Sequence, residues 1–223
     1  VENILCSAFA ASTFLEQAEF KKSGKKVYVI GEKGLTDELD NMGIPWVGGE
    51  TFKNTTVDSP FQPIEIDENI GAVIVGFDRN FNYYKIQYAQ LCLQKTECLF
   101  IATNKDRVTP LTPHQLWAGN AAMVSAIEGC SGRNAVVVGK PSGLFIELLC
   151  KSHNIDLKRA CMIGDRLDTD ILMGNDCGIK TCLVLSGVTS LEDVESESNS
   201  IQPTIILDDV TGLIECGRDA PDR

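Results

Sequence analysis

The sequence is poor in the residues that build zinc sites and disulfide frameworks. Its 223 residues include only two histidines, His114 and His153, and nine cysteines with no Cys-x-x-Cys pair among them. A zinc site needs clustered Cys or His ligands, and a disulfide framework favours an even number of cysteines. We therefore expect reduced, mostly buried thiols, which indicate a cytoplasmic protein.

The sequence also lacks runs of positive charge and long apolar segments. Lysine and arginine never occur in a run longer than a pair, and the formal net charge is −11. A chain of this kind is not expected to bind nucleic acid or an anionic membrane surface. We find no signal-peptide pattern and no apolar run long enough to cross a bilayer. A small anionic substrate remains compatible if a local lysine and a metal ion receive it.

The apolar fraction, 43 %, is that of a globular protein, and apolar strands alternate with amphipathic helices. The block from Val27 to Glu128 has this alternation, so we predict an α/β fold with a core of its own there. The segment Val108–Trp117 contains Pro110 and Pro113 and is predicted to be a loop. The strands are expected at Val27–Ile30, Ile44–Val47, Gly71–Val75, Cys98–Ala102, Arg133–Val138, Cys161–Ile163, Thr181–Leu185 and Thr204–Leu207.

The stretch ACMIGDRLDTDILMGNDCG, Ala160–Gly178, is the most informative part of the chain. Asp165, Asp168 and Asp170 lie within six residues, directly after an apolar strand and Gly164. Ligands of open α/β sheets bind at the carboxyl ends of strands, and crowded carboxylates repel each other unless a cation neutralises them. Mg²⁺ prefers such oxygen ligands. The alternative is that Asp168 only caps the helix that follows.

A second polar loop follows the strand that ends at Val138. It places Lys140 at the carboxyl end of that strand, 25 residues before Asp165. The helix predicted at Gly143–His153 has its N-terminus at the same loop, and a helix N-terminus favours an anion. The pattern therefore indicates a phosphate site beside a metal site. The alternative is a solvated lysine at a surface turn.

These two loops carry a family resemblance. VVVGKPS and MIGDRLDTDIL resemble motifs III and IV of the haloacid-dehalogenase superfamily of aspartate-nucleophile phosphatases. The match is similar to the branch of phosphoglycolate and 4-nitrophenyl phosphatases, which are relatives of pyridoxal phosphatase. It extends over nearly the whole chain through GEKGLTDEL, GAVIVGFDRNFNYYKI, ECLFIATNKD, SGRNAVVVGKPS and CGIKTCLVLSGVTSLEDV.

The resemblance implies a Rossmann-like parallel-sheet core with a large α/β cap inserted in it. Residues 1–10 would be a residual core segment, residues 11–132 the cap, and residues 133–223 the C-terminal part of the core. The core would be partial, because its first strands are missing. Relatives with this cap are often dimeric, so a homodimer through the cap is possible.

The resemblance also implies roles for individual residues. Lys140 corresponds to the lysine that holds the nucleophile and the phosphate, and Asp165 to the acidic Mg²⁺ ligand. Asp170 corresponds to the later acid of the motif, which orients either Lys140 or a metal-bound water. Asp168 belongs to the pattern but is interpreted as a helix cap.

Three further positions concern the substrate. Asn104 and Asp106, in the segment ATNKD, fall in the substrate loop of the cap. Thr109 stands where pyridoxal phosphatases carry a histidine, which disfavours pyridoxal phosphate as the substrate. The substrate implied is a small phosphorylated metabolite.

Two motifs of the family are absent. Motif I, an Asp-x-Asp-Gly that supplies the nucleophile, has no match, because the single Asp-x-Asp here is Asp168-Thr169-Asp170. Motif II is missing as well. Asp78 ends an apolar strand, but it falls in the cap and its second-next residue is Asn80, so we do not assign it as the nucleophile. We expect the chain as it stands to be inactive.

Three functions are compatible with these observations. The leading one is a Mg²⁺-dependent phosphatase of small phosphate monoesters such as 2-phosphoglycolate, working through an aspartyl-phosphate whose nucleophile lies upstream of this chain. The alternative is a non-catalytic, phosphate-binding fragment or binding protein. A receiver-like signalling domain also uses Asp, Lys and Mg²⁺, but the cap block and the order of the two loops argue against it.

Two structural expectations follow. Gly71–Ile101 should belong to the cap, and its strand Val73–Val75 should not share a sheet with both Val136–Val138 and Met162–Ile163. Lys140 and Asp165 should lie within a few ångströms of each other, at the ends of adjacent strands joined by one helical crossover.

Overall fold

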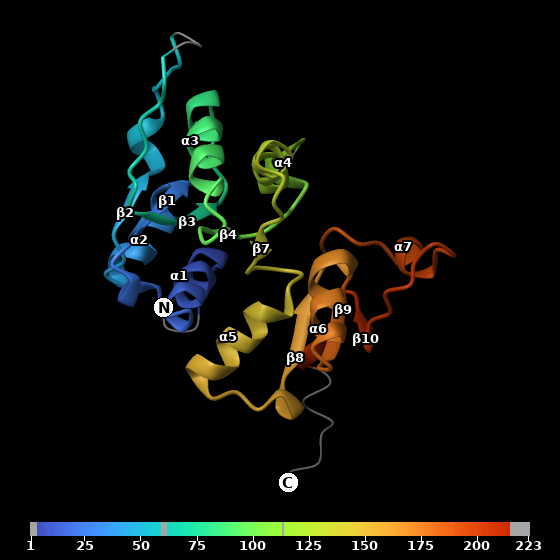
Figure 1. Cartoon of the computed structure of the whole chain (residues 1–223). Coiled ribbons are helices and arrows are strands. Elements are labelled where there is room, and N and C mark those ends of the chain that lie inside the picture. Colours follow the sequence, from blue (N-terminus) through green and yellow to red (C-terminus); the bar gives the residue numbers. More distant parts are fainter. Residues whose placement is uncertain (1–3, 59–61, 113, 215–223) are drawn as a thin grey trace. The chain divides into compact units, whose positions relative to one another are not determined.

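The computed structural model describes residues 4–58, 62–112 and 114–214 of the chain. The chain divides into two compact units, Val1–Gly139 and Lys140–Arg223. Each unit has its own sheet (Figure 1).

The first unit is built on a five-stranded sheet with the order β2-β1-β3-β4-β7, in which all neighbouring strands are parallel. Its strands are β1 (Lys26–Ile30), β2 (Trp46–Gly48), β3 (Ile70–Val75), β4 (Leu99–Ala102) and β7 (Val136–Val137). Helix α1 (Ser7–Gln17) precedes β1, and the helices between strands are α2 (Lys33–Asn41), α3 (Tyr83–Leu93) and α4 (Asn120–Ser131). Helices α3 and α4 cover one face of the sheet, and α1 and α2 lie on the other (Figure 1).

The central strands have little polar character because both of their faces are covered. Every residue of β3 is buried, as is typical of a parallel strand with helices on both faces. On the α3 and α4 face, Tyr28 stacks on Tyr88 with ring centroids 4.3 Å apart, and Val73 and Phe100 belong to the same core cluster. Burial raises the pKa of the Tyr28 hydroxyl far above its usual range. The centre of the sheet is therefore apolar on both faces, and the polar side chains near it follow the ends of its strands.

The order of the strands reverses between β1 and β3. The chain runs from β1 to β2 on one side, and then crosses to β3 on the other side of β1. Such a switch point leaves a crevice at the carboxyl ends of the two strands, because the connections leave on opposite sides. This crevice is lined by residues that follow the strands.

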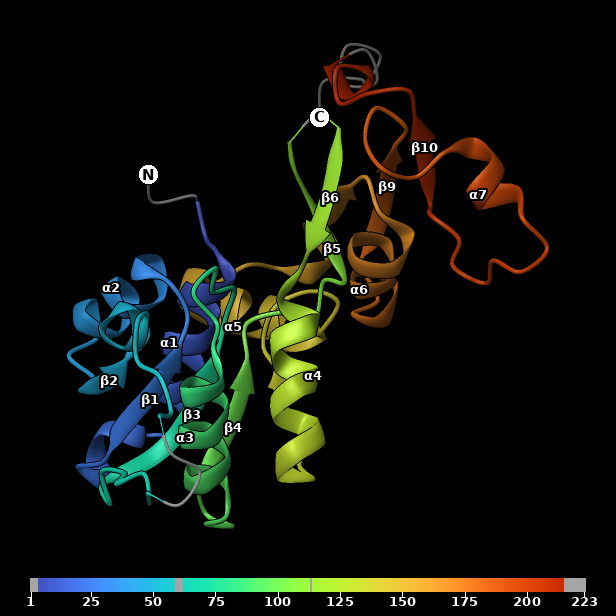
Figure 2. The same ribbon diagram turned by 90° about the horizontal axis from the view of Figure 1, so that it is seen from above.

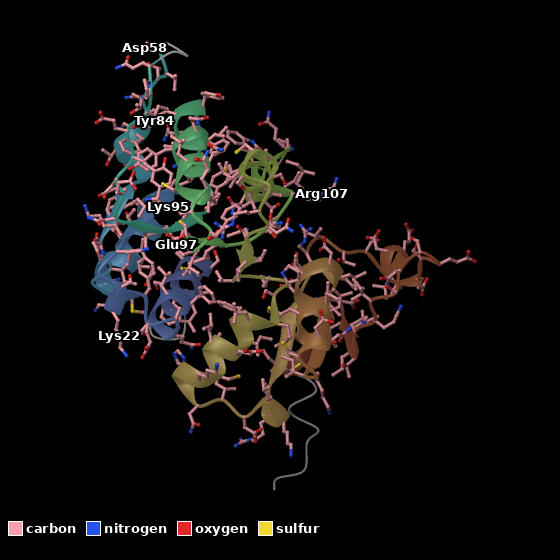
Figure 3. All side chains as sticks on the ribbon, in the orientation of Figure 1. Lys22, Asp58, Tyr84, Lys95, Glu97 and Arg107 are labelled. Carbon is pink, nitrogen blue, oxygen red and sulfur yellow. The ribbon has the colours of Figure 1, made fainter. Side chains whose placement is uncertain are left out.

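The segment predicted to be a loop forms an antiparallel hairpin instead. Strands β5 (Val108–Thr112) and β6 (Gln115–Ala118) pair with each other, with Val108 opposite Ala118. The hairpin projects from the N-terminal end of α4 (Figure 2), and Arg107 at its base is exposed (Figure 3). The loop prediction was wrong because proline is tolerated in an edge strand, and both strands of an isolated hairpin are edges.

The second unit contains a three-stranded parallel sheet in the order β10-β9-β8. Its strands are β8 (Cys161–Gly164), β9 (Lys180–Val184) and β10 (Ile205–Leu207), and its helices are α5 (Gly143–His153), α6 (Leu172–Asp176) and α7 (Leu191–Glu195). A small core forms where Ile171, Leu183 and Val194 meet. Strand β8 is at the edge of this sheet, and 42 % of the Ile163 surface is exposed.

The division between the two compact units falls at Gly139, and β7 pairs with β4 of the first unit through Ile101 and Val136. Ala10 is fully buried in α1, which belongs to the first unit. Strand β3 shares its sheet with β7 but not with β8, which lies in the second sheet. The identity of the units as cap and core of a phosphatase stays a prediction.

The structure describes eight of the nine cysteines. Three of them, Cys92, Cys98 and Cys182, are buried, whereas Cys6, Cys130 and Cys161 are exposed, so burial is less general than expected. Burial raises the pKa of the Cys92 thiol to about 12 and that of Cys98 to about 11. None of the helices in the described ranges has the length and apolar composition that crossing a membrane would require.

The first unit contains a fully buried ion pair. Lys85 Nζ lies 2.5 Å from Asp78 Oδ2, and their side chains are 0 % and 2 % exposed. The second oxygen of Asp78 accepts the Asn80 N–H, at 2.8 Å. The pair fastens the end of β3 to α3, and it removes Asp78 from any reaction with a solvent-borne substrate.

We predict that Lys85→Met destabilises the protein by about 3–5 kcal/mol, because it leaves the Asp78 carboxylate buried without a counter-charge. Chemical unfolding measures the loss. Lys33→Met is the control, since Lys33 pairs with Asp37 on an exposed helix surface and should change stability little. A loss no larger than that of the control would contradict a buried charge at Asp78, and the double variant Asp78→Asn/Lys85→Met should recover stability.

Candidate active site

The candidate site of the second unit begins where β8 ends. Gly164 is the last residue of β8, and Asp165 follows it at the carboxyl end of the strand. The backbone then enters one π-helical turn, Leu167–Ile171, which continues into α6. The turn winds the chain back so that Asp170 packs against Gly164. A Cβ on Gly164 would lie 2.3 Å from the Asp170 Cβ, so only glycine permits this approach.

Asp170 is the centre of the site. Its Oδ1 lies 2.7 Å from Lys140 Nζ, and its Oδ2 accepts the N–H of Arg166 at 3.2 Å. The Asp170 side chain is 4 % exposed, whereas that of Lys140 is 48 % exposed. The carboxylate is thus held inside the fold, and the ammonium group keeps solvent-facing donors. The prediction left open whether Asp170 orients Lys140 or a water molecule, and the geometry favours Lys140.

The helix N-terminus beside Lys140 lies where the sequence placed it. Helix α5 begins at Gly143 and ends at His153, as predicted. Ser142 is its N-cap residue, and the Ser142 hydroxyl oxygen accepts the Leu144 N–H at 3.3 Å. The positive end of this helix and the Lys140 ammonium group therefore follow each other within the same loop, an arrangement that suits an anion.

Asp165 is held by the loop that follows β9. Val188 donates its N–H to Asp165 Oδ2 at 2.9 Å, and Thr189 donates its N–H to the Asp165 carbonyl oxygen at 3.0 Å. In the described part of the chain, the other carboxylate oxygen accepts no hydrogen bond. A hard cation such as Mg²⁺ binds oxygen ligands of this kind. The described residues do not gather three acidic, histidine or cysteine side chains in one place. The second carboxylate oxygen of Asp165 is the kind of ligand that fits Mg²⁺.

Asp168 does not cap the helix. It lies inside the π-helical turn, and its carboxylate accepts two hydrogen bonds from Arg166, at 3.0 Å from Nε and 2.9 Å from Nη2. The capping prediction was wrong because the turn begins earlier, with Arg166 at the N-cap position. The third carboxylate of the acidic stretch therefore forms an ion pair at the surface.

Lys140 and Asp165 do not lie at the ends of adjacent strands. Strand β7, which precedes Lys140, belongs to the five-stranded sheet, and β8, which precedes Asp165, belongs to the three-stranded sheet. Among the described residues, the hydrogen bond and the ion pair of Lys140 go to Asp170 and not to Asp165. The Lys140–Asp170 contact depends on the turn that packs Asp170 against Gly164. The order of the strands alone does not predict this turn.

The first unit has a cavity of about 360 Å³ at the switch point of its sheet. It is lined at the strand ends by Gly31, Gly76, Phe77, Thr103 and Asn104, together with the first residues of α1 and α2. Concave sites at such crevices are where α/β sheets commonly bind small molecules. Asn104, one of the two predicted substrate residues, is therefore at a cavity wall.

The second predicted substrate residue is next to the first. Asn104 Nδ2 donates to Asp106 Oδ2 at 2.6 Å, and the Thr103 hydroxyl lies 3.2 Å from Asn104 Oδ1. At the opposite wall, hydrogen bonds from Arg79 hold the pKa of the Glu32 carboxyl below its usual value. The cavity thus has fixed polar groups on two sides.

The remaining positions that the sequence singled out have ordinary structural roles. Thr109 lies in β5 opposite Trp117, and Asp78 is closed off by Lys85. The sequence reading missed Gly187 and Val188, which contact Asp165. Their segment, LSGVTS, was noted only as part of the resemblance, and the contact joins residues 23 positions apart, so no local pattern indicates it.

The chain is similar to proteins of a known family. A family model described as HAD-hydrolase-like matches residues 137–213. The chain is 47 % identical over 215 residues to the chloroplastic phosphoglycolate phosphatase 1A of Arabidopsis thaliana, covering 96 % of this chain and 59 % of that protein. It is 43 % identical over 216 residues to phosphoglycolate phosphatase 2 of the same plant, covering 96 % and 71 %.

A solved structure is also similar. The glycerol phosphate phosphatase Rv1692 of Mycobacterium tuberculosis, in complex with magnesium, is 26 % identical, with a TM-score of 0.73 and coverage of 95 % of this chain and 58 % of that one. The chain therefore belongs to the family of haloacid-dehalogenase-like phosphatases. It spans about three fifths of the length of the first phosphoglycolate phosphatase that it matches.

We predict that Asp170→Asn destabilises the protein by about 1–3 kcal/mol, because it removes a buried charge that hydrogen-bonds to Lys140. Chemical unfolding at neutral pH measures the change. Asp168→Asn is the matched control. It makes the same chemical change in the same turn, but the Asp168 side chain is 64 % exposed. Equal effects of the two substitutions would contradict the central position of Asp170.

Proposed function

We propose that this chain supplies the phosphate-binding and metal-binding residues of a Mg²⁺-dependent phosphatase that hydrolyses small phosphate monoesters such as 2-phosphoglycolate. The observation that carries the proposal is the Lys140–Asp170 pair, in which a buried carboxylate fixes a half-exposed ammonium group. The Arabidopsis relatives, described as phosphoglycolate phosphatases, support the choice of substrate.

In this proposal Lys140 binds the phosphoryl group of the substrate. Its ammonium group offsets negative charge on the phosphoryl oxygens, and it needs no reorganisation during the reaction because Asp170 already holds it. The N-terminus of α5 adds N–H groups of the same polarity a few residues further on. Asp170 acts on Lys140 and does not contact the substrate.

Asp165 is proposed as the side-chain ligand of Mg²⁺. When bound, the cation supplies positive charge that stabilises the transferring phosphoryl group. The Val188 N–H occupies one carboxylate oxygen and leaves the other for the cation. The Mycobacterium structure with magnesium supports the identity of the metal.

The nucleophile is proposed to be an aspartate that lies upstream of this chain. The reaction would pass through an aspartyl-phosphate, which water then hydrolyses. Strand β8 is an edge strand with an exposed Ile163, so its free edge could pair with a further parallel strand. Without that carboxylate, the chain itself would bind phosphate and not turn it over.

Further parts of the proposal concern the first unit and the surroundings of the protein. Asn104 and Asp106 are proposed to bind the substrate, and the cavity beside Asn104 supports this role. A homodimer through the first unit, a cytoplasmic location, and the absence of nucleic-acid and membrane partners remain predictions. The Arabidopsis relative that is 47 % identical is described as chloroplastic.

The alternative function is phosphate binding without turnover. It has the same Lys140 and Asp165 chemistry and differs only in the absence of a nucleophile. Because both functions share the second unit, the assay must compare the chain with a version that contains an Asp-x-Asp-Gly segment.

We predict that the 223-residue chain does not hydrolyse 4-nitrophenyl phosphate or 2-phosphoglycolate, because its sequence has no match to the Asp-x-Asp-Gly motif that supplies the nucleophile. The chain fused behind the N-terminal segment of the Arabidopsis phosphoglycolate phosphatase should hydrolyse both esters, and only with Mg²⁺. Release of inorganic phosphate is the measurement. Turnover by the fusion should fall at least about 100-fold in Lys140→Ala and in Asp165→Asn.

Two outcomes would contradict the proposal. Mg²⁺-dependent turnover by the chain alone, abolished by Asp78→Asn, would show that the nucleophile lies in the first unit. Turnover by the fusion that survives both Lys140→Ala and Asp165→Asn would show that the phosphate and metal residues are misassigned. A fusion that binds phosphate through Lys140 but never turns it over would favour the alternative function.

A further inference from the structure

The loop between β9 and α7 contacts Asp165 more closely than ordinary packing requires. A Cβ placed on Gly187 would lie 2.1 Å from Asp165 Oδ2 and 2.4 Å from Asp165 Cβ. The second distance is decisive, because Cβ is fixed by the backbone and cannot rotate away. Any side chain at position 187 would therefore displace the whole Asp165 residue or the loop.

Main-chain N–H groups of the same loop form hydrogen bonds with Asp165. Val188 donates its N–H to Asp165 Oδ2, and Thr189 donates its N–H to the Asp165 carbonyl oxygen. The Thr189 hydroxyl oxygen in turn accepts the Leu167 N–H at 3.3 Å. The loop thus holds the residue on both sides of its Cα and also the turn that follows it.

The loop is itself anchored at both ends. Leu185, after β9, donates its N–H to the Leu207 carbonyl oxygen at 2.9 Å. At the other end, Ser190 and Asp193 form a capping box at the start of α7, in which each side chain accepts the other residue's N–H. The Gly187–Thr189 segment therefore has hydrogen-bonded residues on both sides of it in the chain.

Hydrophobic burial does not explain the contact. Gly187 is exposed, and 56 % of the Val188 surface is exposed, so neither residue contributes much to the core. What these two residues provide is space for Asp165 and one aligned N–H group. Both features act on the orientation of a carboxylate.

We infer that Gly187 and Val188 are positioning residues for Asp165, and that they hold its second carboxylate oxygen toward the cation. The inference rests on the proposed function, in which Asp165 is the Mg²⁺ ligand. Residues that orient a metal ligand typically change metal affinity by about 10–100-fold when they are altered.

The contact itself is tested without metal. In the wild-type chain, Gly187→Ala should lower the melting temperature by about 4 °C or more, because the new methyl group cannot fit beside Asp165. In an Asp165→Gly background, which removes the opposing Cβ, the same substitution should have little effect. Equal shifts in both backgrounds would overturn the contact.

The positioning role is tested by Mn²⁺ binding, followed by electron paramagnetic resonance of the free ion at a temperature well below melting. Gly187→Ala should raise the Kd for Mn²⁺ at least about tenfold. Gly174→Ala is the matched control. Its Cβ would lie 2.4 Å from Thr181 Cγ2, so it should also lower the melting temperature, but it lies away from Asp165 and should leave the Kd unchanged.

The outcomes separate the inference from the proposed function. If Asp165→Asn loses Mn²⁺ and Gly187→Ala binds it as tightly as wild type does, the positioning role is overturned and the metal assignment stands. If Asp165→Asn binds Mn²⁺ like wild type, or wild type binds none, the metal assignment fails, and the positioning role fails with it. Equal weakening by Gly174→Ala would show a general effect of destabilisation and would also overturn the inference.

Discussion

The candidate site depends on one buried carboxylate, that of Asp170. It is 4 % exposed and it joins three parts of the second unit, because it accepts from Lys140 and from the Arg166 N–H and packs on Gly164. A buried charge is stable only if it is paired and hydrogen-bonded, and here the pairing group is the lysine that is proposed to bind phosphate. The same interaction that pairs the buried Asp170 charge therefore fixes the Lys140 ammonium group.

Asp165 is fixed by a different means. Its side chain is held by the Val188 N–H and by the absence of a side chain at position 187, whereas Asp170 is held by the Lys140 ammonium group. The Val188 N–H carries no net charge, so it does not compete with a cation for Asp165, whereas Asp170 is already paired with the Lys140 ammonium group. The two aspartates of one short stretch thus have distinct environments, and the distinction agrees with the two roles proposed for them.

Much of this architecture could be predicted from the sequence. Helix Gly143–His153 was predicted with its observed bounds, because an apolar strand, a turn and an amphipathic pattern all agree there. Local sequence patterns did not predict the features that depend on contacts between residues far apart in the chain. The segment Val108–Trp117 is predicted to be a loop, but Val108 pairs with Ala118 in a hairpin. The pairing of Val136 with Ile101 joins residues 35 positions apart, and local patterns do not indicate it. The Val188–Asp165 contact left no trace in spacing or composition.

The central claim is that Lys140, held by Asp170, binds phosphate within the second unit. Titration of the ¹⁵N-labelled chain with inorganic phosphate in the presence of Mg²⁺, followed by NMR, tests it most directly. The account predicts amide shifts at residues 140–144 and 164–170, and their loss in Lys140→Ala. Shifts confined to Val1–Gly139, or binding that Lys140→Ala leaves unchanged, would contradict it.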